Sequence, residues 1–586
     1  MSEARSTQVR FEPDDRPPLY LTIGLGTQFA ILAVTGIVLT PAIVVRAGGG
    51  SEAFLVWAAF AALVVSGLTT ILQARRIGPF GAGYILIMGT SGAFIAVCVT
   101  ALAEGGPGML ATLVFLSSLV QFSLARRLSI LRRILTPAVT GTVIMMIPVT
   151  VMPIVFDMLA AVPDDVEPMA SPLVAGLTLA IILGIAFGAR STLRLWAPII
   201  GIFVGCSVAS WFGLYDTARI AAAGWIGIPD GGWPGFNLDF GPTFWILLPA
   251  FIFVTYVGAI ETVGDSVAIQ SVSWKHRRAI DYKVVQGAVS ADGVGNFLSG
   301  LAGTVPNTTY STSIAVVELT GIAARRVGVC VGLVFLIAAF VPKFAALVLA
   351  IPAPVAAAYL IVLLGLLFVA GMRLVIGDGM DYRKSLMVGT AFWIGAGFQH
   401  GVIFPDLLGP WMGSLVGNGM TAGGVTAVVL TVCLNLMSPK SAVLKTRPGA
   451  GTAREISDFL GKVGSKYGWN ETQTDRLILV GDEMAATLLA ADDDGQERRL
   501  VVKARSEGSS IELEFITSGS DGNVEDEIML LGEQPDRTMV EKELSLRLLR
   551  HYASSVHHQS FTNADILTAR VERPEQGTAE SRPSIE

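Results

Sequence analysis

Long apolar runs recur along the first three quarters of the chain, separated by short polar segments. A helix needs about 20 apolar residues to cross a bilayer, and we count fourteen candidate spans before Pro439. A polar stretch from Asp216 to Asp239 divides them into two sets of seven. The spans begin near Leu19, Ala53, Tyr84, Met109, Leu135, Pro172, Leu195, Phe244, Val284, Thr309, Val327, Pro354, Leu386 and Thr421. The pattern predicts an all-α polytopic membrane protein.

Charge alternates between the polar segments and supports this count. Segments after even-numbered spans are basic, with Arg75, Arg76, Arg126, Arg127, Arg132, Arg133, Arg190, Arg194, Lys275, Arg277, Arg278, Lys283, Arg325, Arg326, Arg373, Arg383, Lys384, Lys440, Lys445 and Arg447. Segments after odd-numbered spans are mainly acidic, with Glu104, Asp164, Asp165, Glu167 and Asp406. Because cytoplasmic loops carry an excess of Lys and Arg, we expect a multi-pass protein of the inner (plasma) membrane with both termini in the cytoplasm.

Composition agrees with a chain folded in lipid. It is 52% hydrophobic and 15% charged, whereas soluble domains carry about 25% charged residues. The net charge of −6 gives no reason to expect a nucleic-acid partner. The four cysteines lie in apolar runs without metal-ligand spacing. No nucleophile–base pair or phosphate-binding loop stands out in the apolar part, so we expect neither a metal site nor an enzyme.

Two sets of seven spans must have opposite orientations, as in an inverted repeat. The third span (residues 81–92) and the tenth (300–313) open alike: an extended stretch broken by Gly or Pro, then hydroxyl residues, then a helix. Ser91 and Thr312 occupy corresponding places. Interrupted spans at matching positions indicate a transporter's binding site. Because half-helix N-termini expose unpaired N–H groups, we expect the hydroxyls there to act first as N-caps.

Two carboxylates lie in the middle of the eighth span. Glu261 and Asp265 are four residues apart and share one helix face. An acid at the centre of a membrane helix costs about 2.5–3.5 kcal/mol to insert. An acid pair that takes up and releases a proton can couple transport to protons. The alternative is a solvated cluster with Lys275, which the roughly 15 Å of helix between Asp265 and Lys275 disfavours.

Four motifs together resemble those of the nucleobase–ascorbate transporters, also called nucleobase:cation symporters or xanthine/uracil permeases. Pro306-Asn307-Thr308-Thr309-Tyr310 resembles the family signature that opens the tenth span. Glu261-Thr262-Val263-Gly264-Asp265 resembles the eighth-span motif of its xanthine and urate members. Residues 89–91 and 137–142 resemble the starts of its third and fifth spans. The resemblance extends over residues 20–437, about three quarters of the chain.

The resemblance implies proton- or cation-coupled uptake of a nucleobase of the xanthine, urate or uracil class by alternating access. It implies a core domain of spans 1–4 and 8–11, a gate domain of spans 5–7 and 12–14, and a homodimer. Glu261 matches the substrate-binding Glu and Asp265 the coupling position. The remaining candidate substrate-binding residues are Gly92, Ser311, Thr312, Ser91, Tyr310, Gln28 and Phe29. The coupling ion would be H⁺ or Na⁺, and no cofactor is implied.

The sequence departs from the family at two places. Members usually carry Glu or Gln and then Asn where this chain has Thr312 and Ser313. The family's Gln-His pair in the first span appears here as Gln28-Phe29. Because these changes alter the polar residues expected around the substrate, the identity of the base is left open. An anion transporter of the same architecture and a membrane ligand sensor that signals through its C-terminal domain remain alternatives.

Beyond Pro439 the sequence becomes that of a soluble protein. We predict a disordered segment 1–18, a membrane domain 19–438, a linker 439–449, a cytoplasmic α/β regulatory domain 450–574 and a disordered tail 575–586. The expected elements of the soluble domain are helices at 451–466, 472–490 and 541–553 and strands at 499–505, 511–518, 559–561 and 566–573.

One helix of the soluble domain carries a recognisable motif. Residues 479–487 are similar to the first motif of histidine-kinase-type ATPases, notably the anti-sigma-factor group. Thr487 stands where that family has the Asn that binds the magnesium on ATP, so we do not expect ATP binding. We expect the domain to regulate, dimerise or bind a cytoplasmic partner. A regulatory domain of the sulfate-transporter type is the rival interpretation.

Overall fold

The structure is a computed structural model that divides into two compact units, described separately below. Met1–Lys275 and Val284–Leu434 form the first unit, and His276–Lys283 and Asn435–Glu586 form the second. The predicted tail 575–586 and residues 1–8 lie outside the described residues. The residues that the structure describes are 9–128, 136–161, 166–189, 191–229, 232–276, 278–377, 379–404, 419–437, 441–447, 451–489, 499–507, 510–517, 548–561 and 565–573.

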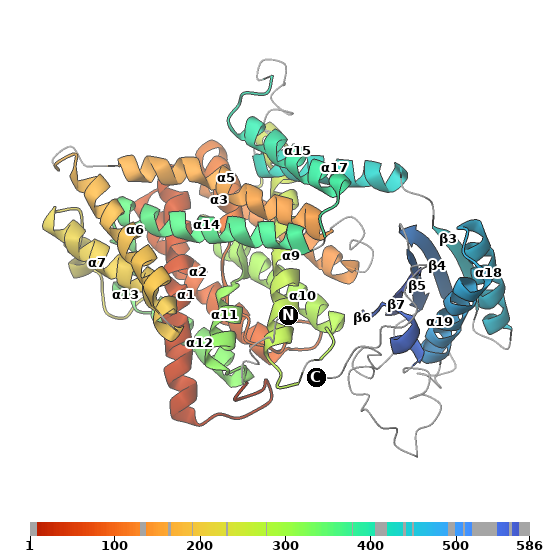
Figure 1. The fold of residues 1–586 in the computed structure, drawn as a ribbon. Helices are drawn as coiled ribbons and strands as arrows, with labels where there is room; N and C mark the ends of the chain where they lie inside the picture. The colour runs from red at the N-terminus through yellow and green to blue at the C-terminus, as the bar shows by residue number, and fades with distance from the viewer. Residues whose placement is uncertain are drawn as a thin grey trace. The chain divides into compact units, whose positions relative to one another are not determined.

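The predicted third and fourth spans, from Tyr84 and Met109, are one helix that begins at Ile95 and is interrupted at Gly106. The first unit is built of helices, most of which begin near a predicted span start (Figure 1). They are α1 (Leu19–Ala47), α2 (Glu52–Arg75), α3 (Ile95–Arg126), α5 (Pro137–Ala160), α6 (Ala170–Gly188), α7 (Ala197–Trp211), α8 (Thr217–Ala222), α9 (Pro242–Val272), α10 (Tyr282–Ala302), α11 (Thr312–Thr320), α12 (Arg325–Ala339), α13 (Pro342–Leu349), α14 (Ala353–Gly377), α15 (Tyr382–Gln399) and α17 (Gly419–Met437). Two 3₁₀ turns precede α3 and α7, namely η1 (Gly92–Phe94) and η2 (Ser191–Trp196). In the described part, nine helices are long and apolar enough to cross a membrane, or ten if α12 and α13 form one bent span. The chain is therefore a multi-pass membrane protein, and the count of fourteen stays a prediction.

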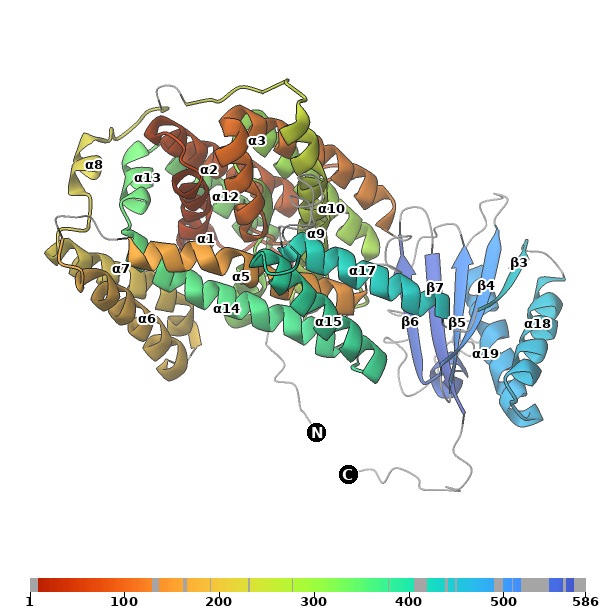
Figure 2. The same ribbon diagram turned by 90° about the horizontal axis from the view of Figure 1, so that it is seen from above.

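The helices of this unit pack in two groups (Figures 1 and 2). One group contains α1, α2, α3, α9 and α12, and the other contains α5, α6, α7, α14 and α15. Small residues allow close crossings: a Cβ at Gly67 of α2 would lie 2.8 Å from the carbonyl oxygen of Gly332 in α12. A Cβ at Gly371 of α14 would lie 2.7 Å from that of Gly141 in α5. Such contacts are typical of helices packed in lipid.

Two interrupted spans meet inside the first group. Strand β1 (Met88–Thr90) precedes η1 and α3, and strand β2 (Asn307–Thr309) precedes α11. The strands pair antiparallel, with Met88 opposite Thr309 and Thr90 opposite Asn307. The two unusual openings seen in the sequence are therefore extended segments that pair with each other, each followed by a helix.

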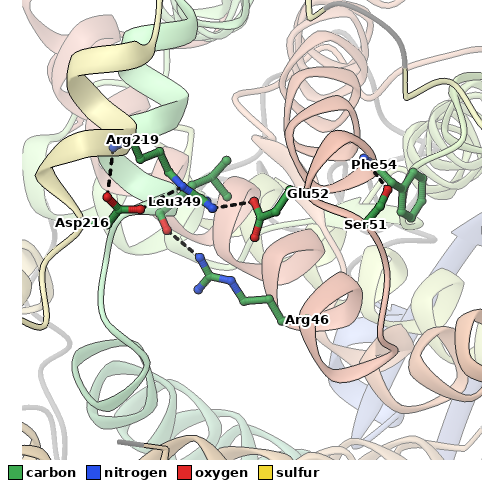
Figure 3. Close-up of polar contacts among 7 residues, drawn as sticks. All are labelled: Arg46, Ser51, Glu52, Phe54, Asp216, Arg219 and Leu349. Atoms are coloured by element: carbon green, nitrogen blue, oxygen red, sulfur yellow. Dashed lines mark hydrogen bonds and ion pairs between the residues drawn. The ribbon is translucent and has the colours of Figure 1, made fainter. Parts of the chain in front are cut away.

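The long polar stretch between α7 and α9 is fastened to helix ends (Figure 3). Arg219 of α8 forms ion pairs with Glu52, the first residue of α2, and with Asp216. Arg46, near the end of α1, donates a hydrogen bond to the Leu349 carbonyl of α13 at 2.7 Å. The ion pair with Glu52 holds α8 against the start of α2, and the Arg46 hydrogen bond joins the end of α1 to α13.

Residues 9–18 form main-chain contacts, although the sequence placed them in a segment expected to be disordered. The Arg10 N–H donates to the Gly321 carbonyl at 2.7 Å, and the Ala323 N–H donates to the Phe11 carbonyl at 2.8 Å. These bonds attach the segment to the connection between α11 and α12. Its hydrogen-bond partners lie about 300 residues away along the chain, which explains why local composition did not reveal it.

The second unit is a sheet covered by helices α18 (Thr452–Lys466) and α19 (Glu471–Leu489). The strands are β3 (Ala442–Thr446), β4 (Leu500–Glu507), β5 (Ser510–Thr517), β6 (Ser555–Ser560) and β7 (Asp565–Glu572). They are all antiparallel in the order β3-β4-β5-β7-β6. This confirms a small C-terminal α/β domain. Strand β3 lies in the predicted linker 439–449. Of the predicted helix 541–553 only 548–553 is described, and it is helical at 548–552.

The core of the second unit is apolar, and two polar residues of α19, Thr487 and Asp482, form hydrogen bonds within the unit. Leu460 and Met484 of the helices are fully buried together with Phe515 of the sheet. The Thr487 hydroxyl donates to the Glu483 carbonyl of its own helix at 2.7 Å. Burial raises the pKa of Asp482, and hydrogen bonds from the Ser457 hydroxyl oppose that shift.

Candidate functional site

The paired strands bring two helix N-termini to one place. The Ser91 N–H donates to the Pro306 carbonyl at 2.9 Å, and the Tyr310 N–H donates to the Ile87 carbonyl at 2.8 Å. These bonds extend the β1–β2 pairing on both sides. The η1 turn, which leads into α3, and helix α11 therefore both begin beside the paired strands. Helix N-termini offer free N–H groups and the positive end of a dipole. The site therefore has donors for carbonyl or anionic groups.

Asp265 of α9 is bound to the second interrupted span by both carboxylate oxygens. The Thr309 hydroxyl donates to Oδ2 and the Ser311 hydroxyl donates to Oδ1, each at 2.7 Å. Asp265 is 6% exposed. Hydrogen bonds to an ionised acceptor are about twice as strong as neutral ones, so these two contacts hold α9 against the start of α11.

The expectation that the hydroxyls act as N-caps is wrong at Ser91 and Ser311. Ser311 precedes α11 but makes no side-chain capping bond, because its hydroxyl donates to Asp265. Ser91 makes no capping bond to η1. In the described part of the chain its buried Oγ has no hydrogen-bond partner. Ser91 Oγ is thus a buried polar atom that no described residue satisfies.

Glu261 lies one turn before Asp265 on α9 and is half-buried. Among the described residues no hydrogen bond is formed by its carboxylate, which remains available as an acceptor. Ser311 and Thr312 are exposed at the start of α11. A Cβ added to Gly92 would have no atom within 4 Å. An acid, two helix N-termini and open space beside Gly92 are what a small polar ligand requires.

Tyr310 of the signature and Ser313, three residues later, have structural roles in this arrangement. The Tyr310 hydroxyl donates to the Thr90 carbonyl at 3.0 Å. The Ser313 hydroxyl is fully buried, accepts from the Ile87 N–H at 2.9 Å and donates to the Tyr310 carbonyl at 2.7 Å. Ser313 thus joins α11 to the strand region before β1. It takes the place of a family Asn without offering a polar atom to a ligand.

Comparison with known proteins decides the class. Residues 21–402 match the model of the Permease family, Xan_ur_permease. The chain belongs to this family. Over 451 residues it is 29% identical to the xanthine permease XanP of Escherichia coli, covering 74% of this chain and 96% of XanP. It is 31% identical over 429 residues to the putative purine permease CPE0397 of Clostridium perfringens, covering 72% of this chain and 92% of that protein.

A solved structure shares the fold of the permease. Murine Slc26a9, an anion transporter in the inward-facing state, is 12% identical with a TM-score of 0.50, covering 74% of this chain and 72% of that chain. The likeness concerns the fold alone. Family membership makes this permease a transport protein rather than an enzyme.

The structure does not join every candidate residue of the permease to this site. Phe29 is 1% exposed within the hydrophobic core, where its ring packs rather than offering a polar atom. Gln28 is half-buried. No described hydrogen bond connects it to β1, β2 or α11. The substrate-binding roles of Gln28 and Phe29 remain predictions.

Sequence reasoning missed a third buried acid of the permease. Asp292 of α10 is fully buried, and its Oδ2 accepts from Gln121 Nε2 of α3 at 2.6 Å and from the Thr262 hydroxyl of α9 at 2.8 Å. The signal was present, because Asp292 and Asn296 are polar residues four apart within an apolar run. They mark one helix face in the same way as Glu261 and Asp265 do.

Proposed function

We propose that this permease moves a nucleobase of the xanthine, urate or uracil class across the inner membrane by proton- or cation-coupled alternating access. The observation that carries the proposal is Glu261, a half-buried carboxylate without a described partner. It lies one turn from Asp265, whose carboxylate is held at the start of the second half-helix. The names of the relatives, xanthine permease and putative purine permease, agree with this substrate class.

Recognition would rest on complementary hydrogen bonds. Xanthine and uracil present alternating N–H donors and C=O acceptors. Glu261 can accept from base N–H groups, while N–H groups at the starts of η1 and α11 can donate to base carbonyls. A hydrogen bond to a charged group contributes about 1.5–3 kcal/mol. The buried Ser91 hydroxyl and the exposed Thr312 hydroxyl would complete the contacts.

Thr312 would set the size of the accepted base. Family members usually carry Glu or Gln at this position, and Thr is shorter and uncharged. Thr312 is exposed at the first position of α11. The shorter side chain leaves more room and one fewer amide or carboxylate, which favours a larger or more substituted base than the usual ones.

Transport would use the two groups of packed helices. The group that contains α1, α2, α3, α9 and α12 carries the site and would form the core domain, and the group around α5 and α14 would form the gate. Fourteen spans in an inverted repeat, cytoplasmic termini and a homodimer through the gate complete the proposal. Two interrupted spans that meet at one site are the arrangement expected of such repeats.

The second unit would regulate transport through the segment that joins α9 to α10. That segment, His276–Lys283, belongs to the second unit. The Tyr282 ring lies 5.0 Å from the Phe561 ring, and the Tyr282 hydroxyl accepts from Gln559 Nε2 at 3.1 Å. Because α9 carries Glu261 and Asp265, a change in the α/β domain could reach the site through this connection. A cytoplasmic partner of the domain would act in the same way.

Ligand-dependent thermal stabilisation of the purified protein tests the proposal. The ligands are xanthine, urate, uracil, sulfate and bicarbonate, with Glu261→Gln as the control variant. Stabilisation by a base that disappears in the variant supports the proposal. Stabilisation by an anion alone would replace it with an anion transporter. A base that stabilises the protein but is never accumulated in vesicles would indicate a sensor.

A further inference from the structure

Two buried acids on neighbouring helices are connected by a pair of hydroxyl groups. Asp265 Oδ2 of α9 receives the Thr309 hydroxyl at 2.7 Å. The Thr309 and Thr262 oxygens are 3.4 Å apart, and the Thr262 hydroxyl donates to Asp292 Oδ2 of α10 at 2.8 Å. All four side chains are at most 6% exposed. The path thus runs from carboxylate to carboxylate through two hydroxyls.

We propose that Thr309 and Thr262 relay a proton between Asp265 and Asp292, an inference that rests on the proposed proton coupling. When Asp265 is neutral, its O–H donates to the Thr309 oxygen, and the Thr309 hydroxyl turns from Asp265 to donate to Thr262. The Asp265 proton then passes to the Thr309 oxygen as the Thr309 proton passes to Thr262. The Thr262 proton passes to Asp292 Oδ2 in the same event. Three O–H bonds break and three form, so both hydroxyls are regenerated and one proton has moved. The 3.4 Å link must shorten as transfer occurs.

The direction of the hydrogen bonds at Asp292 follows from one main-chain group. The Asn307 N–H can only donate, and its acceptor is Asn296 Oδ1 at 2.7 Å. Asn296 Nδ2 must then donate to Gln121 Oε1, at 2.8 Å. Gln121 Nε2 is therefore the atom facing Asp292 Oδ2, at 2.6 Å. The signature residue Asn307 thus orients a chain of amides that ends at the acid.

Given these hydrogen-bond directions, Thr262 is the group that can accept a proton from Asp292 Oδ2. Gln121 presents only N–H groups to that oxygen and cannot accept from it. The Thr262 oxygen can accept, because a hydroxyl is both donor and acceptor. Asp292 Oδ1 has no hydrogen-bond partner in the described part of the chain. A fully buried carboxylate oxygen without a donor is costly in the ionised form, so Asp292 is suited to receive the proton.

The other groups around the relay explain how a substrate would engage it. Glu261 is a further acid and lies one turn before Asp265 on α9. The Tyr310 hydroxyl is a further titratable group at this place; it donates to the Thr90 carbonyl and interacts electrostatically with Tyr359 of α14. The described groups facing Asp292 from α3 and α9 are the neutral Gln121 and Thr262. A base bound to Glu261 would therefore change the charge balance at Asp265, the first end of the path.

Matched substitutions separate a relay from a packing role. Thr309→Val and Thr262→Val remove a hydroxyl at nearly constant shape, whereas Thr309→Ser and Thr262→Ser retain it. The full-length protein is reconstituted in vesicles, and base-driven proton uptake is followed with a pH-sensitive dye, using xanthine, urate and uracil as probes. Base exchange at equal pH, which needs no net proton movement, is measured in parallel with thermal unfolding.

The relay predicts that both Val variants lose proton uptake by about 100-fold, the size of a positioned proton-transfer effect. Base exchange and the unfolding temperature should fall far less than proton uptake in the Val variants, and the Ser variants should stay within a few-fold of the wild type in all three measurements. Val variants that pump protons normally would overturn the relay. So would Ser variants as inactive as the Val variants, because retained hydroxyls would then be insufficient. Wild-type protein that moves a base without protons would contradict the proposed coupling itself, and the relay with it.

Discussion

The Tyr310 hydroxyl donates a hydrogen bond to the main-chain carbonyl of Thr90 at 3.0 Å, across the paired strands. Its ring lies against Gly89, where an added Cβ would overlap it. The residue that follows β2 thus closes over β1. The two interrupted spans are thereby joined by side-chain packing as well as by their main-chain pairing. We infer that the two helix N-termini move as one rigid piece during transport.

Tyr310→Phe tests this connection. The change removes one hydrogen bond, which contributes about 0.5–1.5 kcal/mol, and keeps the ring. We expect a several-fold rise in the KM for the base, with a small decrease in thermal stability, because the helix N-termini are held less firmly. Uptake kinetics and thermal unfolding of the same preparation measure both effects. Unchanged values in both would contradict the role given to the hydroxyl.

Gly89→Ala should destabilise the protein, because the new methyl group overlaps the Tyr310 ring. Overpacking of this kind costs about 1–3 kcal/mol. The matched control is Gly92→Ala, where the methyl group meets no atom within 4 Å. The control should fold normally yet transport poorly, because the methyl group enters the space proposed for the base. Equal unfolding temperatures for the two variants would count against this geometry.

Asp265→Asn should separate binding from coupling. Asn keeps one oxygen to accept from Thr309 or Ser311 but carries no charge and cannot deliver a proton. We expect base exchange to continue while uptake against a gradient is lost. Ser311→Ala, which removes one donor to Asp265 and leaves the acid, should retain accumulation at a reduced rate. Accumulation by Asp265→Asn at the wild-type level would show that the acid does not couple transport.

The second unit should lose stability as pH rises from acid toward neutral. Burial raises the pKa of Asp482, so the folded state binds its proton more tightly than the unfolded chain does. The added stability is present below the usual Asp pKa of about 3.9 and is lost as pH rises through the raised value. At neutral pH, hydrogen exchange in α18 and α19 should slow in Asp482→Asn and quicken in Ser457→Ala. The opposite order would show that ionised Asp482 stabilises the helices.

The sequence was most informative where the signal is local. Apolar runs placed the helices, and Gly and Pro beside hydroxyl residues indicated the extended openings that became β1 and β2. The spacing of Glu261 and Asp265 placed both acids on one face of α9. In the second unit, the predicted strands 499–505 and 511–518 correspond to β4 and β5, which pair with each other.

Long-range partners could not be predicted in this way. The preference for hydroxyl residues at helix starts predicted N-capping there. The Ser311 hydroxyl instead donates to the carboxylate of Asp265, 46 residues away, because an ionised acceptor binds a donor more strongly. Asp292 owes its surroundings to Gln121, 171 residues away. Residues 9–18 and strand β3 likewise depend on main-chain partners elsewhere in the chain. Each of these contacts is set by the fold and not by neighbouring residues.

Uptake of radiolabelled xanthine, urate and uracil into vesicles by wild type and Glu261→Gln tests the central claim most directly. Gln keeps the length of the side chain but removes the charge that would accept base N–H groups. The account predicts that the wild type accumulates at least one base and that the variant, folded and inserted normally, does not. Accumulation of the same base by Glu261→Gln at the wild-type rate and KM would contradict it.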